Sequence, residues 1–573
     1  MPAKPSGEIK TRIIHNTRKN GDIYVIERQT IYDAEKKYNV VIDEKLISKI
    51  PKGSEVAVPT RPKKAKGEKE QNHTDSLVAS RKHIGMMKII DHIGDVSGID
   101  DGIYSNTDLG TAQKLISIAR YFLATNGQTL PGIIAWQFNH PLPYEDGISE
   151  GIYHELFAAV GRDEALQQNF FLSRCTEIKG KPVLAYDSTT VSTYSDNQIE
   201  ARYGYNKAGD GLKTIKLLTL YSIETRQPIA FTKQPGNISD VVTIETALKQ
   251  LAILGLGNAE IVTDNGYYSE HNLTEFFLSN FEFITLAKTS IVWIKPEIDN
   301  HRTDFESLAS MCPFDTGIHG ITLTLTRDFT KVYPNGEEKI LSKEVYLNLY
   351  FNPVRKLEDD LSFDNDLFEL KRTIEEGLNI SDMSPSAQKK IEKYLYLNQE
   401  EGHIQITFNE KTCSEAKKYH GYFALVSNSE KNPFDCLYKY RKRETIESFF
   451  ESMKQHVDGM RVRVWDTDTL RGRMFVQFIA LCYYEYLSNE VRNLKDSLGI
   501  KNGDPVHDTE KNIKLEKKLK YWLNESPIYL ILQWFDTVEG VDVSSKLLSK
   551  RWSTEITQRD KLFLDKLGVE LSY

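Results

Sequence analysis

The sequence is poor in cysteine, and its few cysteines are scattered. They form no C-x-x-C pair and have no histidine close enough to complete a zinc site: Cys175, Cys312, Cys413, Cys436 and Cys482. This spacing argues against a structural zinc site and against a disulfide framework. It is typical of a protein kept in a reducing compartment, so we expect a cytoplasmic location.

Long apolar runs and targeting signals are also missing. The N-terminal stretch MPAKPSGEIKTRIIHN has no apolar segment of the kind found in signal peptides. The longest apolar run, MFVQFIALCYYEYL from Met474, is too short and too aromatic to span a bilayer. We therefore expect no membrane segment, and we interpret the run from Met474 as a buried core helix.

Several common catalytic motifs do not occur. The sequence has no H-E-x-x-H and no G-x-S-x-G motif, and its 13 histidines are dispersed. The stretch GYNKAGDGLKT, from Gly204, has two glycines at the spacing of a phosphate-binding loop, but Asp210 stands where the lysine should be. These observations argue against a P-loop nucleotide site.

Charge is segregated along the chain. The 573 residues are 40% hydrophobic and 27% charged, as in ordinary soluble globular proteins, and the net charge is −8. Two segments are locally basic, RPKKAKGEK from Arg61 and the region from Lys439 to Arg473. The net charge argues against a simple nucleic-acid coat protein, but local patches decide binding. LEDDLSFDNDLFEL, from Leu357, is strongly acidic, and we interpret it as a solvated face or an intersubunit surface.

The order of helical and strand-like patterns predicts several domains. The first sixty residues alternate apolar and polar residues around turn signals, as a small β-meander does, and a basic linker follows. Helical periods then continue to about Arg174, with Asp108 as a predicted N-cap. The pattern after Arg174 is β-β-β-α-β-α-β, which predicts a mixed sheet with helices packed on it. We therefore expect an α/β fold within a multidomain α+β chain.

Two aspartates stand at positions that suit a ligand site. Asp187 is the first polar residue after the apolar run PVLAY, and Asp264 ends the strand-like run AEIVTD. An aspartate at the carboxyl end of a strand faces the crevice in which α/β sheets bind ligands. Each aspartate also has a plainer interpretation as a cap of the following turn. A buried carboxylate at Asp187 would, however, need a partner or a metal.

A row of polar residues follows the helical stretch YRKRETIESFFESMK. Tyr440, Arg443, Glu447 and Lys454 are spaced so that all four fall within about 60° of arc on one helix, beside its apolar stripe. Taken alone, Glu447 is a solvated helix residue. The row as a whole suits a glutamate that binds a divalent metal while the arginine and lysine hold phosphates and the tyrosine packs beside them.

Three carboxylates brought together need cations between them, because they repel one another. Oxygen ligands suit Mg²⁺ or Mn²⁺, and two such ions can activate a water or a 3′-hydroxyl for attack on a phosphodiester. We therefore predict that Asp187, Asp264 and Glu447 are the catalytic metal ligands of a nuclease or strand-transfer site. A two-carboxylate glycosidase is an alternative, but it does not explain the cationic row.

These residues resemble the DDE transposases of bacterial insertion sequences, and more narrowly the subgroup with the signature Y-x2-R-x3-E-x6-K. Tyr440, Arg443, Glu447 and Lys454 fit this signature at every position. The segments YDST, YGYNK, PGNISD and TDNGY are similar to the family around its two aspartates. The similar segments extend over about residues 181–289 and 420–485, so they cover both parts of the expected site.

The resemblance implies an RNase H-like catalytic core whose triad of two aspartates and Glu447 binds two Mg²⁺ or Mn²⁺ ions. It also implies that Tyr440, Arg443 and Lys454 contact phosphates of the DNA end. The chain would bind the terminal inverted repeats of its own element and target DNA. It would act as a homodimer in the synaptic complex and be associated with the nucleoid.

The expected domain organisation has six parts. They are residues 1–72, a β-rich segment and basic linker; 73–178, a helical domain that binds DNA ends; 179–290, the first part of the catalytic core; 291–415, a partly β insertion; 416–500, the second part of the core with the Glu447 helix; and 501–573, a C-terminal helical region.

Two other functions remain open on the same fold. One is a DNA-binding protein that no longer catalyses, and the other is a structure-specific nuclease that cleaves branched DNA regardless of its end sequence. The intact triad and signature favour an active transposase, because loss of function would be expected to erode them first.

Overall fold

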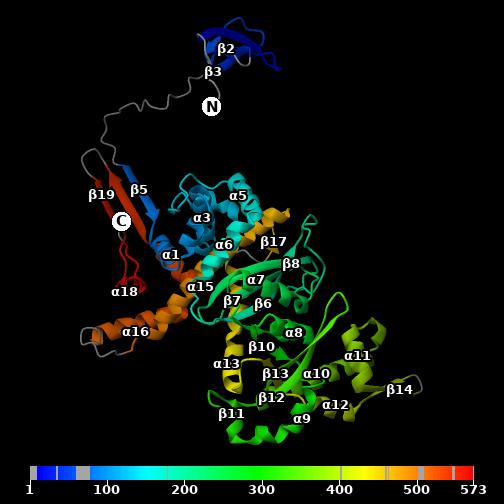
Figure 1. Cartoon of the computed structure of the whole chain (residues 1–573). Coiled ribbons are helices and arrows are strands. Elements are labelled where there is room, and N and C mark those ends of the chain that lie inside the picture. The colour runs from blue at the N-terminus through cyan, green and yellow to red at the C-terminus, as the bar shows by residue number, and fades with distance from the viewer. Residues whose placement is uncertain are drawn as a thin grey trace. The chain divides into compact units, whose positions relative to one another are not determined.

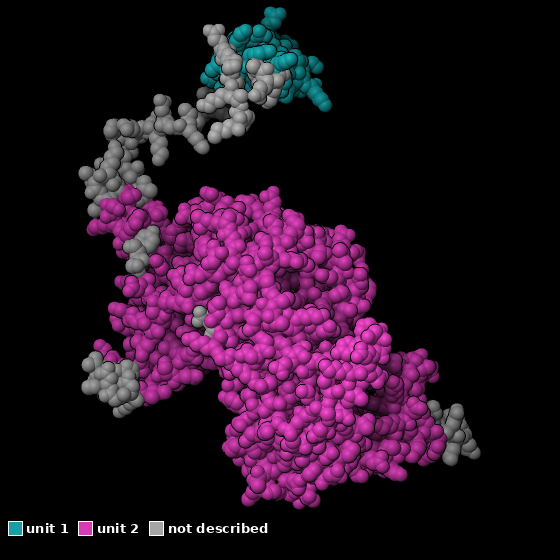
Figure 2. Space-filling view, in the orientation of Figure 1, with its two compact units in different colours: residues 1–77 teal, residues 78–573 magenta. Residues whose placement is uncertain are grey.

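The computed structural model describes residues 9–33, 37–59, 78–176, 178–400, 403–457, 461–462, 464–500, 509–544 and 549–571. The chain separates into two compact units, residues 1–77 and residues 78–573 (Figure 2). The basic segment expected from Arg61 to Lys69 lies outside the described residues, as does Arg463 of the second basic region.

The first unit is a four-stranded antiparallel sheet. Its strands pair in sequence order: β1 (Lys10–Thr17), β2 (Ile23–Asp33), β3 (Tyr38–Ile50) and β4 (Val58–Pro59). Gly21, in the turn between β1 and β2, has a φ of 87°, a conformation that glycine adopts without strain. Consecutive antiparallel pairing is a meander, so the predicted N-terminal β-meander is confirmed.

Helices dominate the first part of the second unit, after the short strand β5 (Val78–His83) (Figure 1). They are α1 (Gly85–Val96), α2 (Ile99–Tyr104), α3 (Leu109–Ala124), α4 (Ile133–Trp136), α5 (Glu150–Arg162) and α6 (Glu164–Cys175). Asp108 accepts a hydrogen bond from the Thr111 N–H at 3.1 Å, so it caps α3 as predicted.

A mixed sheet of ten strands runs through the second unit. Half of it has the order β8-β7-β6-β9-β10, with β6, β7 and β8 antiparallel and with β9 parallel to both β6 and β10. These strands are β6 (Val183–Thr193), β7 (Lys213–Ser222), β8 (Gln227–Pro235), β9 (Glu260–Thr263) and β10 (Glu282–Ala287). Helices α7 (Ile244–Ile253) and α8 (Glu270–Leu278) connect β8 to β9 and β9 to β10. This is the strand order of an RNase H-like core, and the predicted fold class is confirmed.

The other half of the sheet comes largely from the insertion between β10 and β16 (Tyr422–Ser427). The elements of the insertion are α9 (Lys295–Asn300), β11 (Met311–Cys312), β12 (Asp315–Val332), β13 (Glu338–Phe351), α10 (Pro353–Glu375), α11 (Pro385–Tyr394), β14 (Leu395–Glu400), β15 (His403–Phe408) and α12 (Glu410–Lys417). Since β16 pairs with both β10 and β13, the long hairpin β12–β13 continues the sheet of the core.

The acidic segment from Leu357 forms most of helix α10 and is paired within the chain. Asp364 forms an ion pair with Lys417 of α12 at 2.6 Å, and Asp366 forms one with Lys390 of α11 at 2.6 Å. The segment is largely exposed, in agreement with the interpretation as a solvated face. It also connects helices of the insertion through these ion pairs, which the sequence did not indicate.

Two helices replace the single helix expected over Tyr440 to Lys454. Helix α13 (Pro433–Lys442) ends and α14 (Glu444–His456) begins at Arg443. The Arg443 N–H donates to the Tyr440 carbonyl at 3.0 Å, and the Ile446 N–H donates to the Arg443 carbonyl at 2.9 Å. Both bonds span three residues instead of four, which tightens the turn. The expectation of one continuous helix is therefore wrong at Arg443.

Helix α15 (Thr467–Ser497) contains the apolar run from Met474, and that run is buried as predicted. The helix crosses α5 at backbone contact, because a Cβ at Gly472 would overlap the carbonyl oxygen of Phe157. A Cβ at Gly161 would likewise overlap the carbonyl oxygen of Asp468. The two glycines therefore allow the helices to approach more closely than other residues would.

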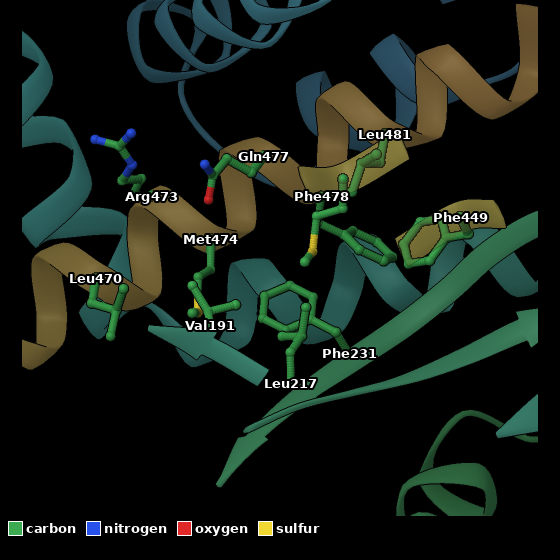
Figure 3. Close-up of a pocket in the computed structure, with 11 residues that line it drawn as sticks. Val191, Leu217, Phe231, Phe449, Leu470, Arg473, Met474, Gln477, Phe478 and Leu481 are labelled. Carbon is green, nitrogen blue, oxygen red and sulfur yellow. The ribbon is translucent and has the colours of Figure 1, made fainter. Parts of the chain in front are cut away.

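An apolar cluster joins α14 and α15 to the sheet (Figure 3). Phe449 of α14 and Met474 and Phe478 of α15 lie against Leu217 and Phe231 of the sheet. They surround a cavity of about 20 Å³, so the packing is close to complete. This contact fixes α14 against the strands that carry the candidate site.

The C-terminal elements return to the first part of the second unit. They are α16 (Glu510–Glu525), α17 (Ile528–Asp536), β18 (Glu539–Ser544), β19 (Ser549–Ser553) and α18 (Gln558–Leu567). Strand β18 pairs with β5 on one side and with β19 on the other. Among the described residues, no helix has the length and apolar character needed to cross a membrane.

Candidate active site

The two predicted aspartates lie on neighbouring parallel strands at equivalent positions. The register between β6 and β9 places Ala185 opposite Val262, and Asp187 and Asp264 each follow two residues later. Strand β9 ends at Thr263, so its pairing with β6 stops before the aspartates. The sheet therefore opens between the two strands at the point where both carboxylates stand.

Asp187 is held in a buried environment with a cationic partner. Its side chain is 14% exposed, and it accepts hydrogen bonds from the Ser188 N–H at 2.7 Å and from Arg443 at 3.3 Å. Burial raises the pKa of Asp187, the Asp264 carboxylate adds to this, and the Arg443 guanidinium opposes it. The two aspartates are thus close enough to repel each other.

Asp264 caps a turn, as one of the two interpretations from the sequence predicted, and it also contacts Tyr440. Its carboxylate caps the turn after β9 by accepting from the Asn265 N–H at 2.7 Å. It also accepts a hydrogen bond from the Tyr440 hydroxyl at 3.2 Å. Burial and the Asp264 carboxylate raise the pKa of Tyr440, so its hydroxyl keeps the proton that it donates.

Glu447 projects from the first turn of α14, whose apolar side chains Ile446 and Phe449 are buried. Its side chain is 58% exposed, and one of its carboxylate oxygens accepts from Arg443 at 2.8 Å. The guanidinium of Arg443, only 6% exposed, therefore stands between Glu447 and Asp187. This buried arginine connects the helix to the strand.

All three predicted carboxylates line one cleft of about 680 Å³. Lys454 lines the cleft as well, because Glu447 and Lys454 lie on the same face of α14. Tyr440 and Arg443 are not among the residues that line the cleft, and their side chains contact the carboxylates instead. The structure thus brings together all six residues that the sequence indicated, in two different roles.

Lys207 and Asp240 also line this cleft, and neither was assigned a role from the sequence. The Lys207 Nζ donates to the Ser188 carbonyl at 3.0 Å. Asp240 accepts from the Ser188 hydroxyl at 2.7 Å and pairs with Lys216 at 2.6 Å. The sequence could have indicated Lys207 and Asp240, because they belong to the YGYNK and PGNISD segments that resemble the family.

Two lysines give the cleft a cationic side. Burial lowers the pKa of Lys454, and the neighbouring charge of Lys207 lowers it further. Among the described residues, Lys454 has no hydrogen-bond or ion-pair partner, and Lys207 contacts neutral oxygen atoms alone. Lys207 also attracts the Asp187 carboxylate. Two adjacent cations at one side of a cleft favour the binding of an anion such as a phosphate there.

The donor set of the cleft fits hard divalent cations. Asp187, Asp264 and Glu447 offer oxygen atoms, which Mg²⁺ and Mn²⁺ prefer. The carboxylate oxygens of the three do not all come within 4.8 Å of one another, since Arg443 stands between Glu447 and Asp187. This spacing does not suit a single ion bound by all three carboxylates.

Another group of potential metal ligands lies outside the cleft. Among the described residues, ligand atoms of His83, His140 and Asp536 lie within 4.8 Å of one another. The two imidazole rings are stacked, with centroids 4.6 Å apart and planes at 17°. A ligated metal lies near the plane of each imidazole, so two stacked rings do not direct their nitrogens to one ion. His140 instead contacts the Trp136 carbonyl at 2.7 Å and the Asp536 carboxylate at 3.0 Å, which connects α4 to α17.

The chain was compared with known protein sequences, structures and families. No curated protein matches it in sequence. A cryo-EM structure of the piggyBac transposase synaptic complex with hairpin DNA is similar over 77% of each chain, with 10% sequence identity and a TM-score of 0.34. The family model for the transposase DDE domain matches residues 178–483, which is more than half of the 573 residues. The chain therefore belongs to the transposase DDE domain family.

Proposed function

We propose that this protein is the DNA transposase of a bacterial insertion sequence, of the subgroup with the Y-x2-R-x3-E-x6-K signature. It binds the terminal inverted repeats of its own element, hydrolyses a phosphodiester at each end and joins the freed 3′-hydroxyl to target DNA. The observation that carries this proposal is the single cleft lined by Asp187, Asp264, Glu447, Lys207 and Lys454.

The family uses divalent metal ions, and the three carboxylates are the residues that would hold them. We propose two ions, Mg²⁺ or Mn²⁺. When bound, such ions lower the pKa of the attacking water or hydroxyl and stabilise charge on the leaving oxygen.

The side chains around the carboxylates then have distinct tasks. Lys207 and Lys454 bind the non-bridging oxygens of the scissile phosphate and orient it in the cleft. Arg443 neutralises and orients Asp187 and Glu447, and Tyr440 does the same for Asp264. We further propose that Tyr440 and Arg443 contact flanking phosphates of the DNA end once DNA is bound.

Two bond exchanges follow in sequence. In the first, a water oxygen attacks the phosphorus, the bond to the 3′ oxygen breaks, and a 3′-hydroxyl and a 5′-phosphate are released. In the second, that 3′-hydroxyl attacks a target phosphodiester, so that a new 3′–5′ link forms while the target releases its own 3′-hydroxyl. Both steps need the same in-line arrangement at one cleft, which explains why one triad serves both.

The remaining assignments extend this proposal to the whole chain. Residues 73–178 bind the terminal repeats, 179–290 and 416–500 form the catalytic core, and 291–415 form the insertion. The protein acts as a homodimer that pairs two element ends, in the cytoplasm at the nucleoid. Residues 1–72 and 501–573 have no proposed part in catalysis.

The test uses purified protein, a labelled duplex that carries the terminal repeat, and Mg²⁺. The parent chain is expected to cleave the duplex at the repeat end, and Asp187→Ala and Glu447→Ala are expected to abolish cleavage while binding persists. Glu444→Ala removes the same charge from the same helix outside the cleft and should cleave normally. Normal cleavage by the Glu447→Ala protein would contradict the catalytic assignment.

The two alternatives make different predictions. A catalytically silent DNA-binding protein would bind the repeats and cleave nothing under any metal. A structure-specific nuclease would cleave branched DNA of unrelated sequence as well as the repeats. Short inverted repeats flanking the gene, together with near-identical copies elsewhere in the genome, would support the transposase over both.

A further inference from the structure

The segment between β6 and β7, residues 194–212, carries an unusual number of exposed aromatic side chains beside the cleft. Here it is called the aromatic loop. Tyr194 is 64% exposed, Tyr203 is 70% exposed and Tyr205 is 78% exposed, and Tyr205 lines the cleft itself. Trp465, 72% exposed, is adjacent through its carbonyl oxygen, which accepts from Ser195 at 3.3 Å. A gathering of exposed rings at one place marks a binding surface.

Two polar side chains of the aromatic loop, Gln198 and Asn206, brace it from within. Gln198, 2% exposed, donates to the carbonyls of Val464 at 3.1 Å and Asp466 at 2.9 Å. Asn206 donates to Asp210 at 2.6 Å. Other polar side chains of the loop, among them Asp196 and Arg202, are exposed together with the rings. The bonds of Gln198 and Asn206 therefore anchor the loop that carries the exposed tyrosines.

Gly204 separates the two central tyrosines of the aromatic loop. A Cβ at Gly204 would overlap the carbonyl oxygen of Gly236 in the turn after β8, so this residue packs against backbone. The backbone at residue 204 therefore lies against the turn after β8, between the two exposed tyrosines Tyr203 and Tyr205.

The aromatic loop carries cations beside its rings. Two of its three acidic side chains have cationic partners, since Asp196 pairs with Lys213 at 2.8 Å and Glu200 pairs with Lys233, while the third, Asp210, accepts from Asn206. Lys207 donates to a backbone carbonyl, as does Arg202, which bonds to the Ala201 carbonyl at 2.9 Å. The loop thus presents rings together with two cations, one of which, Lys207, lines the cleft.

We propose that the aromatic loop stacks on unpaired bases of the DNA strand whose phosphate enters the cleft. The proposal rests on the proposed function, and it adds the requirement that the strand be locally single-stranded at the site. A paired duplex hides the faces of its bases, so exposed rings gain a stacking partner only where bases are unpaired. The loop therefore holds the opened DNA end in position for strand transfer.

The experiment measures binding of the full chain to two DNA probes in the presence of EDTA, which prevents cleavage. One probe is a fully paired duplex, and the other is the same duplex with a short single-stranded tail that contains 2-aminopurine. The parent chain is expected to bind the tailed probe more tightly and to quench the 2-aminopurine fluorescence through stacking. The double variant Tyr203→Ala/Tyr205→Ala should lose at least about fivefold in affinity for the tailed probe and lose the quenching, with duplex binding unchanged.

Two further variants separate stacking from structural effects. Tyr203→Phe/Tyr205→Phe keeps both rings and should retain the tail preference and the quenching. Tyr521→Ala, on α16, removes an equally exposed tyrosine (70%) elsewhere and should behave as the parent does. Thermal unfolding of each variant checks that the fold is intact.

Each other outcome overturns the inference. If the parent binds both probes equally, or if the alanine variant keeps the tail preference, the loop does not stack on bases although the proposed function stands. If the alanine variant changes the sedimentation of the free protein and leaves DNA binding unaffected, the rings form a contact between two copies of the chain. If the parent binds neither probe, both the inference and the proposed function are wrong.

Discussion

Glu485 of helix α15 is a buried carboxyl group whose ionisation is expected to destabilise the folded chain. Its side chain is 9% exposed, and the Tyr221 hydroxyl on β7 donates to it at 3.0 Å. Burial raises its pKa from 4.5 to about 7, against the opposing effects of Tyr221, Arg492 and Arg226. The substitution Glu485→Gln keeps the shape and the acceptor for Tyr221 and removes the charge.

The size of the effect follows from the two pKa values. Between pH 4.5 and about 7 the unfolded chain loses a proton that the folded chain retains, so stability falls as the pH rises and then becomes constant. Each pH unit in this interval lowers the free energy of unfolding by about 1.4 kcal/mol, which gives a loss of about 3 kcal/mol in total. With an unfolding entropy of about 2 cal/mol/K per residue, this corresponds to about 3 °C for a cooperative unit of this size.

The assay is thermal unfolding of the parent and Glu485→Gln at about pH 5 and about pH 8. The variant is expected to melt higher than the parent at the higher pH, by about 3 °C, and almost equally at the lower pH. Glu490→Gln makes the same change of charge on the same helix and controls for net charge. A gain of equal size at both pH values, or a loss at the higher one, would refute the assignment of a buried carboxyl that ionises near neutrality.

Three further substitutions test other parts of the structure. Lys454→Ala should weaken DNA binding and reduce the slope of the logarithm of the binding constant against the logarithm of the salt concentration by about 1, because one phosphate contact is lost. Lys442→Ala, outside the cleft, should leave the binding constant for the specific site nearly unchanged. Gly472→Ala should lower Tm and reduce the free energy of unfolding by about 1–3 kcal/mol, because the added Cβ overlaps α5. Gly151→Ala on α5, where a Cβ meets nothing within 4 Å, should leave Tm unchanged. Phe449→Ala should lower the free energy of unfolding by about 3–5 kcal/mol and should lower both Tm and cleavage activity, since the ring fixes α14 to the sheet. Activity equal to that of the parent, at a temperature where the variant is folded, would argue against a link between this contact and the site.

The core strands could be predicted from the sequence because their signals are local. Strands β6, β7 and β9 each contain an apolar run, and this pattern needs no knowledge of the partner strand. Strand β6 continues past Asp187 to Thr193, which the pattern did not show. The placement of Asp187 and Asp264 followed from the same pattern, since each stands where an apolar run gives way to polar residues. The equivalence of their positions in the β6–β9 register could not be predicted, because register depends on pairing.

The break at Arg443 could not be predicted, because its cause is tertiary. The stretch from Tyr440 to Lys454 has unbroken helical periodicity, so propensity and pattern favour one helix. Ion pairs from Arg443 to a carboxylate on β6 and to one on α14 accompany the tight turn in the structure. The same contacts engage the Arg443 side chain with two carboxylates of the triad, and the sequence did not indicate this.

The insertion shows a second limit of local patterns. Its strands β12 and β13 were recognisable as strand-like pieces, but their continuation of the core sheet through β16 depends on pairing across some seventy residues. The acidic segment of α10 likewise looked like a solvated surface, because its basic partners Lys390 and Lys417 lie on other helices. The basic partners of an acidic segment can therefore be identified only once the fold is known.

The most direct test of the central claim is to incubate the purified protein with a labelled element end, a target plasmid and Mg²⁺, and to map the products. The proposed function predicts that the label is joined to the target through the 3′-hydroxyl of the element. It also predicts that Glu447→Gln forms neither the cleaved nor the joined product, whereas Glu444→Gln, on the same helix, forms both. Joined product from the Glu447→Gln protein, or none from the parent with its own element ends, would contradict the account.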